Sequence, residues 1–434
     1  MSMKDYTERL GTAPLGKLLV KLSLPGIAAS ITQSLFNIVD TIFVGTLGFR
    51  AISALTIVFP YQILFWAVGG GTGTGIAALV SRRFGERKAD EANRVAGQIF
   101  FLSLFWGLMF VLIAIFLHDP ILRLIGAKED FFHYAVQYFT IISYGAPLAI
   151  FTSLAASLMR ASGDAVKPMI IMIAATVVNI ILCPLMIQGI GPFPRLEVAG
   201  SAWATFTAQA VGTAIALLFI LANKTAYKIK AAHLKPNWQI IKEIYHVGAP
   251  SAVLQITESF AFALWNIAVS SFSSAAVAAV GVVIRVSDFA FMPVMGVSNG
   301  LLPIVGYNYG AKNYKRLWQS VKLASFGIGL LMVVLSLVMI ICAPWIVSIF
   351  STDPELLKAY YYLLQIAHII LQILEGGSLL RAAAAEFGRT PRQLFGSLKN
   401  LARRLLEAFR YIRLSDEAFD PLHASRIQVR FDTS

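Results

Sequence analysis

Charged residues are scarce in this sequence. Asp, Glu, Lys and Arg make up 14% of its 434 residues, whereas a soluble protein of this length carries about 25%. Hydrophobic residues make up 57%, and apolar segments of about 20 residues or longer recur along most of the chain. The scarcity of charge excludes an ordinary soluble protein, and the recurring segments predict an all-α polytopic membrane protein.

Residues for metal, disulfide and nucleotide chemistry are also few. The two cysteines, Cys183 and Cys342, lie in apolar segments, and the six histidines are scattered. The glycine-rich run 69–75, GGGTGTG, lacks the Lys-Ser/Thr ending of a phosphate loop, so we expect it to permit close helix packing. No zinc-helix signature or nucleophile elbow is present. The sequence therefore predicts no enzyme and no cofactor beyond a coupling ion.

The apolar segments predict ten spanning helices. They cover residues 18–45, 51–80, 92–117, 131–157, 166–189, 198–222, 240–271, 275–306, 317–350 and 355–382. The predicted organisation is an N-terminus (1–17), an N-lobe of six helices (18–222), a linker (223–239), a C-lobe with four recognisable helices (240–382) and an atypical basic tail (383–434).

Basic residues concentrate in alternate loops. They include the runs 82–88, 224–235 and 312–316, and the net charge is +13. Lys and Arg favour the cytoplasmic side of a membrane protein, so both termini and the linker are predicted to be cytoplasmic. The basic cytoplasmic loops account for the net positive charge, so no nucleic-acid partner is predicted.

The chain contains an internal repeat with an offset of 225 residues. Pro25 aligns with Pro250, Gly85 with Gly310, and Gly163 with Gly388, each pair within similar flanking sequence. An even number of spans separates the copies, so we expect two parallel-repeat helical lobes with a binding site between them.

The repeat predicts two more spans after Gly388, giving twelve in all. The stretch that follows it carries several charged residues within the length of one span. Such a segment does not insert readily, so we expect an amphipathic helix on the inner leaflet. About ten recognisable spans of an expected twelve therefore remain, and the last two are missing or replaced.

Asp40 is the carboxylate within the first apolar segment. A charged residue at the centre of a bilayer costs roughly 3 kcal/mol on insertion scales, and residues of this kind mark ion or proton pathways. Asp40 thus indicates a transporter.

These features resemble the multidrug and toxic compound extrusion family, in particular its MepA-like and DinF-like branch. The resemblance rests on APLGKLLVKLSLP, NIVDTIFVGTLG, SRRFGERK, LMRASGD and GLLPIVGYNYGAKNYKR, in this order, and covers residues 12 to about 392. It implies twelve helices in two lobes and cation-coupled export of amphipathic, often cationic, compounds.

The resemblance also implies a coupling-cation site in the N-lobe. Asp40 matches its acid on the first helix, Asn179 its asparagine on the fifth, Thr205 its threonine on the sixth, and Tyr138 a nearby tyrosine on the fourth. The second acid of the pattern falls on Cys183, which is no hard oxygen ligand for Na⁺. A Na⁺ site at Asp40, Asn179 and Thr205 is thereby in doubt, whereas proton coupling through Asp40 is unaffected.

Further candidates come from the C-lobe and from the first helix. Glu258, eight residues after Pro250, matches a seventh-helix glutamate of NorM-type members, and Gln33 is its repeat partner. Auxiliary candidates are Arg285, Gln33, Asn37 and Glu375.

The sequence thus predicts an H⁺- or Na⁺-coupled antiporter for amphipathic small molecules. We expect a monomer spanning a bacterial or archaeal plasma membrane (the inner membrane). Two alternatives remain open at this stage. One is a lipid-linked saccharide flippase of the same superfamily. The other is a truncated or altered membrane protein that does not transport.

Overall fold

In the computed structural model, the described residues are 3–125, 127, 129–222, 225–270 and 274–350. Within these ranges the side chains at 3–7, 37–39, 41, 49, 52, 56, 130, 258–270, 274–291, 336–337 and 339–350 are not described. The predicted tenth helix (355–382), the tail (383–434), Cys342 and Glu375 therefore lie outside the described residues or side chains.

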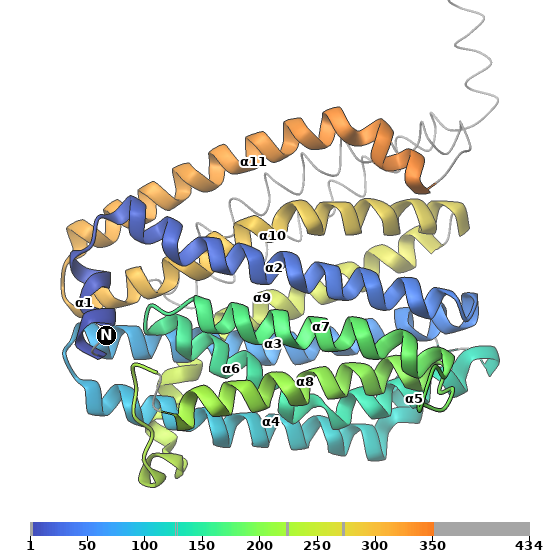
Figure 1. Ribbon diagram of the computed structural model, residues 1–434, viewed down its shortest axis with the longest axis horizontal. Helices are drawn as coiled ribbons and strands as arrows, with labels where there is room; N and C mark the ends of the chain where they lie inside the picture. The colour runs from blue at the N-terminus through green and yellow to red at the C-terminus, as the bar shows by residue number, and fades with distance from the viewer. Residues whose placement is uncertain (1–2, 126, 128, 223–224, 271–273, 351–434) are drawn as a thin grey trace, which may run out of the picture. The chain divides into compact units, whose positions relative to one another are not determined.

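Throughout the described ranges the secondary structure is helical. Eleven α-helices and one short 3₁₀ helix occur in the order α1 (Met3–Thr12), α2 (Leu15–Gly45), α3 (Phe49–Gly85), α4 (Ala89–Leu124), α5 (Glu129–Tyr144), α6 (Ala146–Ala161), α7 (Val166–Gln188), α8 (Val198–Leu221), η1 (Ala231–Leu234), α9 (Trp238–Ser270), α10 (Ser274–Gly310) and α11 (Tyr314–Phe350). The long helices run alongside one another as a bundle (Figure 1). The predicted all-α fold is confirmed.

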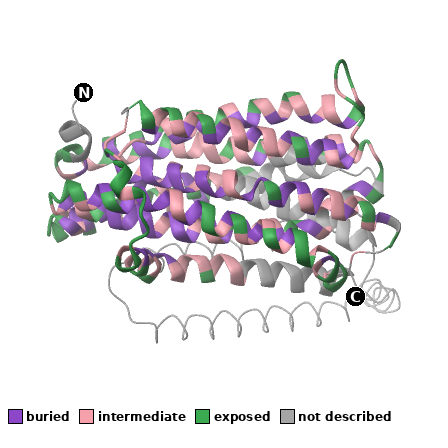
Figure 2. Cartoon of the chain, turned by 90° about the horizontal axis from the view of Figure 1, so that it is seen from below, coloured by how far each residue is buried: buried purple, intermediate pink, exposed green. Residues whose placement is uncertain are grey.

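The helices are long and apolar enough for a membrane protein. Six described helices meet the length and hydropathy of a membrane span, and α5 with α6 makes a seventh if this bent pair is one span. Buried positions follow the inner faces of the helices, whereas many outward positions are exposed or intermediate (Figure 2). All nine predicted segments before residue 350 contain helix at the expected place.

The fourth predicted span is broken. Helix α5 ends at Tyr144 and α6 begins at Ala146, and the two axes differ by 48°. Pro147 lies in the first turn of α6 and has no N–H to continue the hydrogen bonds of α5. The predicted span over 131–157 is present, but as two helices with a break at Gly145 rather than as one.

The N-terminal segment before the first predicted span contains a helix that the sequence did not predict. Residues 3–12 form α1, and Leu10 is fully buried against the bundle. Its carbonyl oxygen accepts a hydrogen bond of 3.1 Å from Asn308 Nδ2, and the Arg316 guanidinium donates to the carbonyl oxygen of Ala13. The N-terminus is thereby fastened to α10 and α11.

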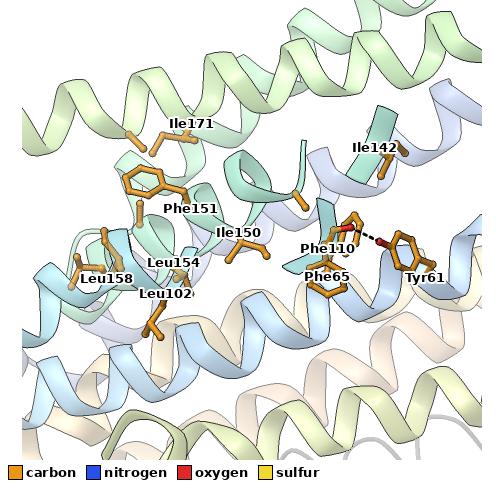
Figure 3. Close-up of a cluster of buried hydrophobic side chains, with 14 of the residues drawn as sticks. Tyr61, Phe65, Leu102, Phe110, Ile142, Ile150, Phe151, Leu154, Leu158 and Ile171 are labelled. Atoms are coloured by element: carbon orange, nitrogen blue, oxygen red, sulfur yellow. Dashed lines mark hydrogen bonds between the residues drawn. The ribbon is translucent and has the colours of Figure 1, made fainter. Parts of the chain in front are cut away.

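Aromatic and branched apolar side chains fill the interior among α3, α4, α5 and α6. Tyr61 stacks on Phe139 with ring centroids 4.0 Å apart, and its hydroxyl donates to the carbonyl oxygen of Phe110 at 3.2 Å (Figure 3). Phe65 lies edge-on to Phe110 at 4.4 Å. This packing holds the first half of the bundle (α2–α8) as one core.

Two glycines join the halves of the bundle symmetrically. A Cβ added to Gly85 at the end of α3 would lie 2.0 Å from the carbonyl oxygen of Tyr307 in α10. A Cβ added to Gly310 at the end of α10 would lie 2.0 Å from the carbonyl oxygen of Arg82 in α3. Gly310 follows Gly85 by 225 positions, and the contacted Tyr307 follows the contacted Arg82 by the same number. The repeat therefore makes the same contact twice, as a twofold relation between two equivalent surfaces requires.

A second symmetric pair lies further along the helices. A Cβ on Gly71 of α3 would meet the Ala252 Cβ of α9, and a Cβ on Gly296 of α10 would meet the backbone nitrogen of Ile27 in α2, at 2.5 Å. These positions again differ by 225. Since Gly71 belongs to the glycine-rich run 69–75, the prediction that this run permits close helix packing is confirmed. We call these close contacts of Gly71, Gly85, Gly296 and Gly310 the glycine seam.

An ion-pair cluster lies at the same end of α3 as Gly85. Arg83 contacts Glu243 of α9 at 2.9 Å and both Glu86 and Glu91 at 3.1 Å, and Lys88 contacts Glu91 at 3.3 Å. Burial opposes the ionisation of Glu86, but hydrogen bonds and charge from the neighbouring arginines outweigh it and hold the pKa of Glu86 below its usual range. The cluster links α3 to α9 across the two halves.

Candidate functional site

Asp40 lies where α2 packs against α7 and α8. Its side chain is buried, 6% exposed. The Ser201 hydroxyl donates a hydrogen bond of 2.5 Å to Asp40 Oδ1, and the Cys183 thiol lies 3.4 Å from the same oxygen. Because Ser201 is in the first turn of α8, the positive end of that helix dipole also favours a negative charge here.

The depth of Asp40 is smaller than the sequence suggested. It precedes the end of α2 at Gly45 by five residues, which is about 7.5 Å of helix. The carboxyl group is therefore nearer to the end of the bundle opposite the N-terminus than to the middle of the helix.

Asn179 and Thr205 form a second polar layer. Asn179 Nδ2 donates to Thr205 Oγ1 at 3.4 Å. Asn179 precedes Cys183 by one turn of α7, and Thr205 follows Ser201 by one turn of α8, so this pair lies about 5.4 Å from the Asp40 layer. Two of the residues that the resemblance assigns to one site thus contact each other beside Asp40.

Buried oxygens in this region lack hydrogen-bond donors. Among the described side chains, Asn179 Oδ1 and Thr176 Oγ1 are buried without a partner. An unsatisfied buried polar group typically costs 1–3 kcal/mol. These oxygens provide acceptors for water or a small cation on the face of α7 that continues from Cys183.

Tyr138 adds a hydroxyl from α5. It is 3% exposed, and its hydroxyl interacts with the side chains of Gln62 and Ser201 and with the charge of Asp40. Tyr138 is therefore in the Asp40 layer, connected through Ser201. Sequence reasoning missed both Ser201 and Gln62, because hydroxyl and amide residues are common in spanning helices and neither carries a distinguishing motif.

The oxygen donors suit a proton better than Na⁺. The residues that lie together offer one carboxylate, the Asn179 amide oxygen and hydroxyl groups, and the thiol of Cys183 occupies the place of the second acid. A hard cation prefers oxygen ligands, and a thiol is a soft one. A proton requires only the titratable Asp40.

The remaining candidates lie on α2, α9 and α10 or outside the described residues. Gln33 is half-buried on α2. Glu258 lies on α9 and Arg285 on α10, but their side chains, like that of Asn37, are outside the described set. Glu375 lies outside the described residues altogether.

A polytopic helical bundle with repeated halves and a polar layer around a buried carboxyl group defines a membrane transporter. The MatE family model matches residues 25–185 and 250–395. The chain therefore belongs to the MatE family of transporters.

Similar proteins agree with this assignment. The chain is 31% identical to the FAD transporter of Shewanella oneidensis over 82% of its own length and 78% of that protein. It is 25% identical to the multidrug export protein MepA of Staphylococcus haemolyticus over 81% of its length and 76% of that protein. A solved structure described as an outward-facing multidrug resistance MATE family transporter superposes with a TM-score of 0.82 at 25% identity, covering 89% of this chain and 86% of that one.

Proposed function

We propose that this transporter exports amphipathic small molecules in exchange for protons, with Asp40 as the group that takes up the coupling proton. The observation that carries the proposal is the pairing of Asp40 with Cys183 and Ser201. One buried carboxyl group in contact with a thiol and a hydroxyl can hold a proton, but supplies few ligands for Na⁺.

The cycle follows from the cost of the buried charge. Ionised Asp40 accepts the Ser201 hydrogen bond at the end of the bundle that the positive-inside rule assigns to the outside. A proton arriving from that side removes the charge and changes which packing of α2, α7 and α8 is favoured. Coupling is reciprocal, so substrate and proton must each weaken the binding of the other in some state of the transporter.

The test is efflux from proteoliposomes that contain the full chain and a fluorescent organic cation. Asp40→Asn should abolish efflux driven by an imposed pH gradient and leave the melting temperature close to that of the parent. Asp119→Asn is the matched control, because the Asp119 side chain is 58% exposed and lies on the surface of α4. Efflux by Asp40→Asn at the parent rate contradicts the proposal, as does efflux driven by Na⁺ alone.

The substrate class has two candidates. The multidrug export relative favours organic cations. The FAD transporter relative favours an anionic dinucleotide, and Arg160 of α6, which bonds to Ser157 Oγ at 2.9 Å, has no ion-pair partner among the described residues. Uptake assays with ethidium and with FAD in the same vesicles separate the two, and Arg160→Gln should impair only the dinucleotide.

A further inference from the structure

A cavity of about 310 Å³ opens between α4 and the segment that links the two halves. It is lined by Arg94 and Gln98 of α4, by His233 and Lys235 of the linker, and by Asn237 and Ile240 at the start of α9. In Figure 1 the linker lies beside the N-terminal end of α4. We call this cavity the linker pocket.

The wall of the linker pocket is held in place by one buried amide. Gln98 is 1% exposed. Its Nε2 donates to the carbonyl oxygens of Lys235 at 3.1 Å and His233 at 3.3 Å, and its Oε1 accepts the backbone N–H of Asn237 at 3.0 Å. A Cβ on Gly97 would lie 2.2 Å from the His233 carbonyl oxygen, so the linker packs directly on α4. The donors that face the pocket are therefore presented by a fixed backbone.

Those donors are positive or carry N–H groups. His233 Nδ1 accepts the backbone N–H of Lys230 at 3.2 Å, so a neutral His233 carries its proton on Nε2 and can donate. Asn237 Oδ1 caps the first turn of α9, accepting from Gln239 and Ile240, and its Nδ2 remains a donor. The 33-residue helix α9 thus begins at the pocket, with its N-terminal N–H groups directed toward it.

The charge of the pocket is not neutralised by nearby acids. Within the described part of the chain, neither Arg94 nor Lys235 has an ion-pair partner. Glu91 and Glu243, the acids on the adjoining turns of α4 and α9, are engaged by Arg83. Two free cations, two N–H donors and a helix N-terminus favour a phosphate group as the ligand.

The surroundings favour a lipid phosphate over a soluble one. Trp238, directly after Asn237, is 70% exposed, and its ring lies edge-on to Phe101 of α4 at 6.2 Å. Beyond Phe101, the outward side of α4 presents the exposed apolar residues Leu104, Phe105, Leu108 and Leu112. Phe101 follows Arg94 by seven residues, about 10 Å along the helix. This exceeds the depth of one headgroup layer, roughly 5–8 Å, so the acyl chains of a lipid whose phosphate lies at Arg94 reach Phe101.

We propose that the linker pocket binds the phosphate of an anionic phospholipid, with Arg94, His233 and Lys235 on the headgroup and the acyl chains along α4. Because Arg94 belongs to α4 and Lys235 to the linker, the lipid would join the first half of the bundle to the segment that leads into α9. A basic pocket between spanning helices is a recognised form of headgroup site.

The experiment uses the full chain in vesicles and brominated lipids, which quench tryptophan fluorescence on contact. The fluorescence of Trp238 is obtained as the difference in tryptophan fluorescence between the parent and the Trp238→Phe variant. We expect brominated phosphatidylglycerol to quench it at a lower mole fraction than brominated phosphatidylcholine. Arg94→Gln with Lys235→Gln should reduce this preference about thirtyfold, because two basic residues at about 1 kcal/mol each contribute about 2 kcal/mol.

The matched control is Lys17→Gln with Lys315→Gln, which removes two exposed basic residues elsewhere on the described surface. It should keep the preference, and melting temperatures verify that each variant is folded. Equal quenching by the two lipids, or an unchanged preference in the pocket variant, overturns the proposal. Loss of the phosphatidylglycerol preference in millimolar inorganic phosphate overturns the lipid assignment in favour of a soluble anion. Neither result depends on transport activity.

Discussion

The Ser201 hydroxyl of α8 donates a hydrogen bond of 2.5 Å to Asp40 Oδ1 of α2. The hydroxyl joins the carboxyl group to Tyr138, which interacts with both Ser201 and Asp40. The carboxyl group is therefore surrounded by polar side chains rather than by bulk water, and replacing one of them should change the pH at which it loses its proton.

Ser201→Ala should move the pH of half-maximal transport upward. The charged form of Asp40 loses the hydrogen bond that stabilises it, whereas the protonated form loses less stabilisation. A more alkaline solution is therefore needed to remove the proton. The measurement is the initial rate of efflux from proteoliposomes as a function of internal and external pH. Ser320→Ala removes a buried hydroxyl that donates to the carbonyl oxygen of Leu317 within α11, and it should leave the profile unchanged. A midpoint that stays in place in both variants would separate Ser201 from coupling.

Cys183→Asp should create sensitivity to Na⁺. The substitution places a second carboxyl group beside Asp40, where the thiol is now 3.4 Å away, and completes an oxygen-rich set with Asn179 and Thr205. We expect Na⁺, but not K⁺, to raise the melting temperature of this variant and not that of the parent. Cys183→Ser, which adds no charge, is the control. Stabilisation of the parent by Na⁺ would contradict proton coupling.

Gly85→Ala should destabilise the contact between the halves. The new Cβ would lie 2.0 Å from the Tyr307 carbonyl oxygen, and relief requires a shift of α3 or α10, at a cost of about 1–3 kcal/mol. Gly327→Ala is the control, because its Cβ would meet nothing within 4 Å and alanine favours the helix by roughly 1 kcal/mol. Thermal unfolding in one detergent compares the two. An unchanged melting temperature for Gly85→Ala would mean that the helices do not approach this closely.

The ion-pair cluster should weaken in acid. The pKa of Glu86 is held below the ordinary value of 4.5, so its contribution to stability is complete above that value and is lost as the pH falls through the lower folded-state pKa. Glu86→Gln should therefore lose less melting temperature than the parent as the pH falls from about 5 to about 3. The Glu129→Gln control removes an exposed partner of Arg123 and should follow the parent.

The helices were predictable because hydropathy alone requires them. Segments such as 166–189 and 198–222 carry no charged residue beyond Lys167, and α7 and α8 begin and end within one residue of those bounds. The break at Gly145 was not predictable from hydropathy, since Ala146 and Pro147 are as apolar as their neighbours. Helix α1 was missed because its ten residues are mostly polar and its stability comes from contacts with α10 and α11.

The site was predictable only in part. Asp40 is conspicuous because of its cost in an apolar segment, and the resemblance supplied Asn179, Thr205 and Tyr138. The role of Ser201 could be recognised only from the structure. Its hydroxyl reaches Asp40 because of how α8 packs on α2, and nothing in the neighbouring sequence indicates this contact. The division into lobes and the roles of these residues remain predictions.

At Gly85 and Gly310 of the glycine seam, a carbonyl oxygen of the opposite helix lies directly against the glycine. No side chain stands between the helices there that could swing aside to open a path for water. A leak of ions through this contact would require whole helices to separate. The seam therefore makes the resting bundle tight to small solutes along the boundary between its halves.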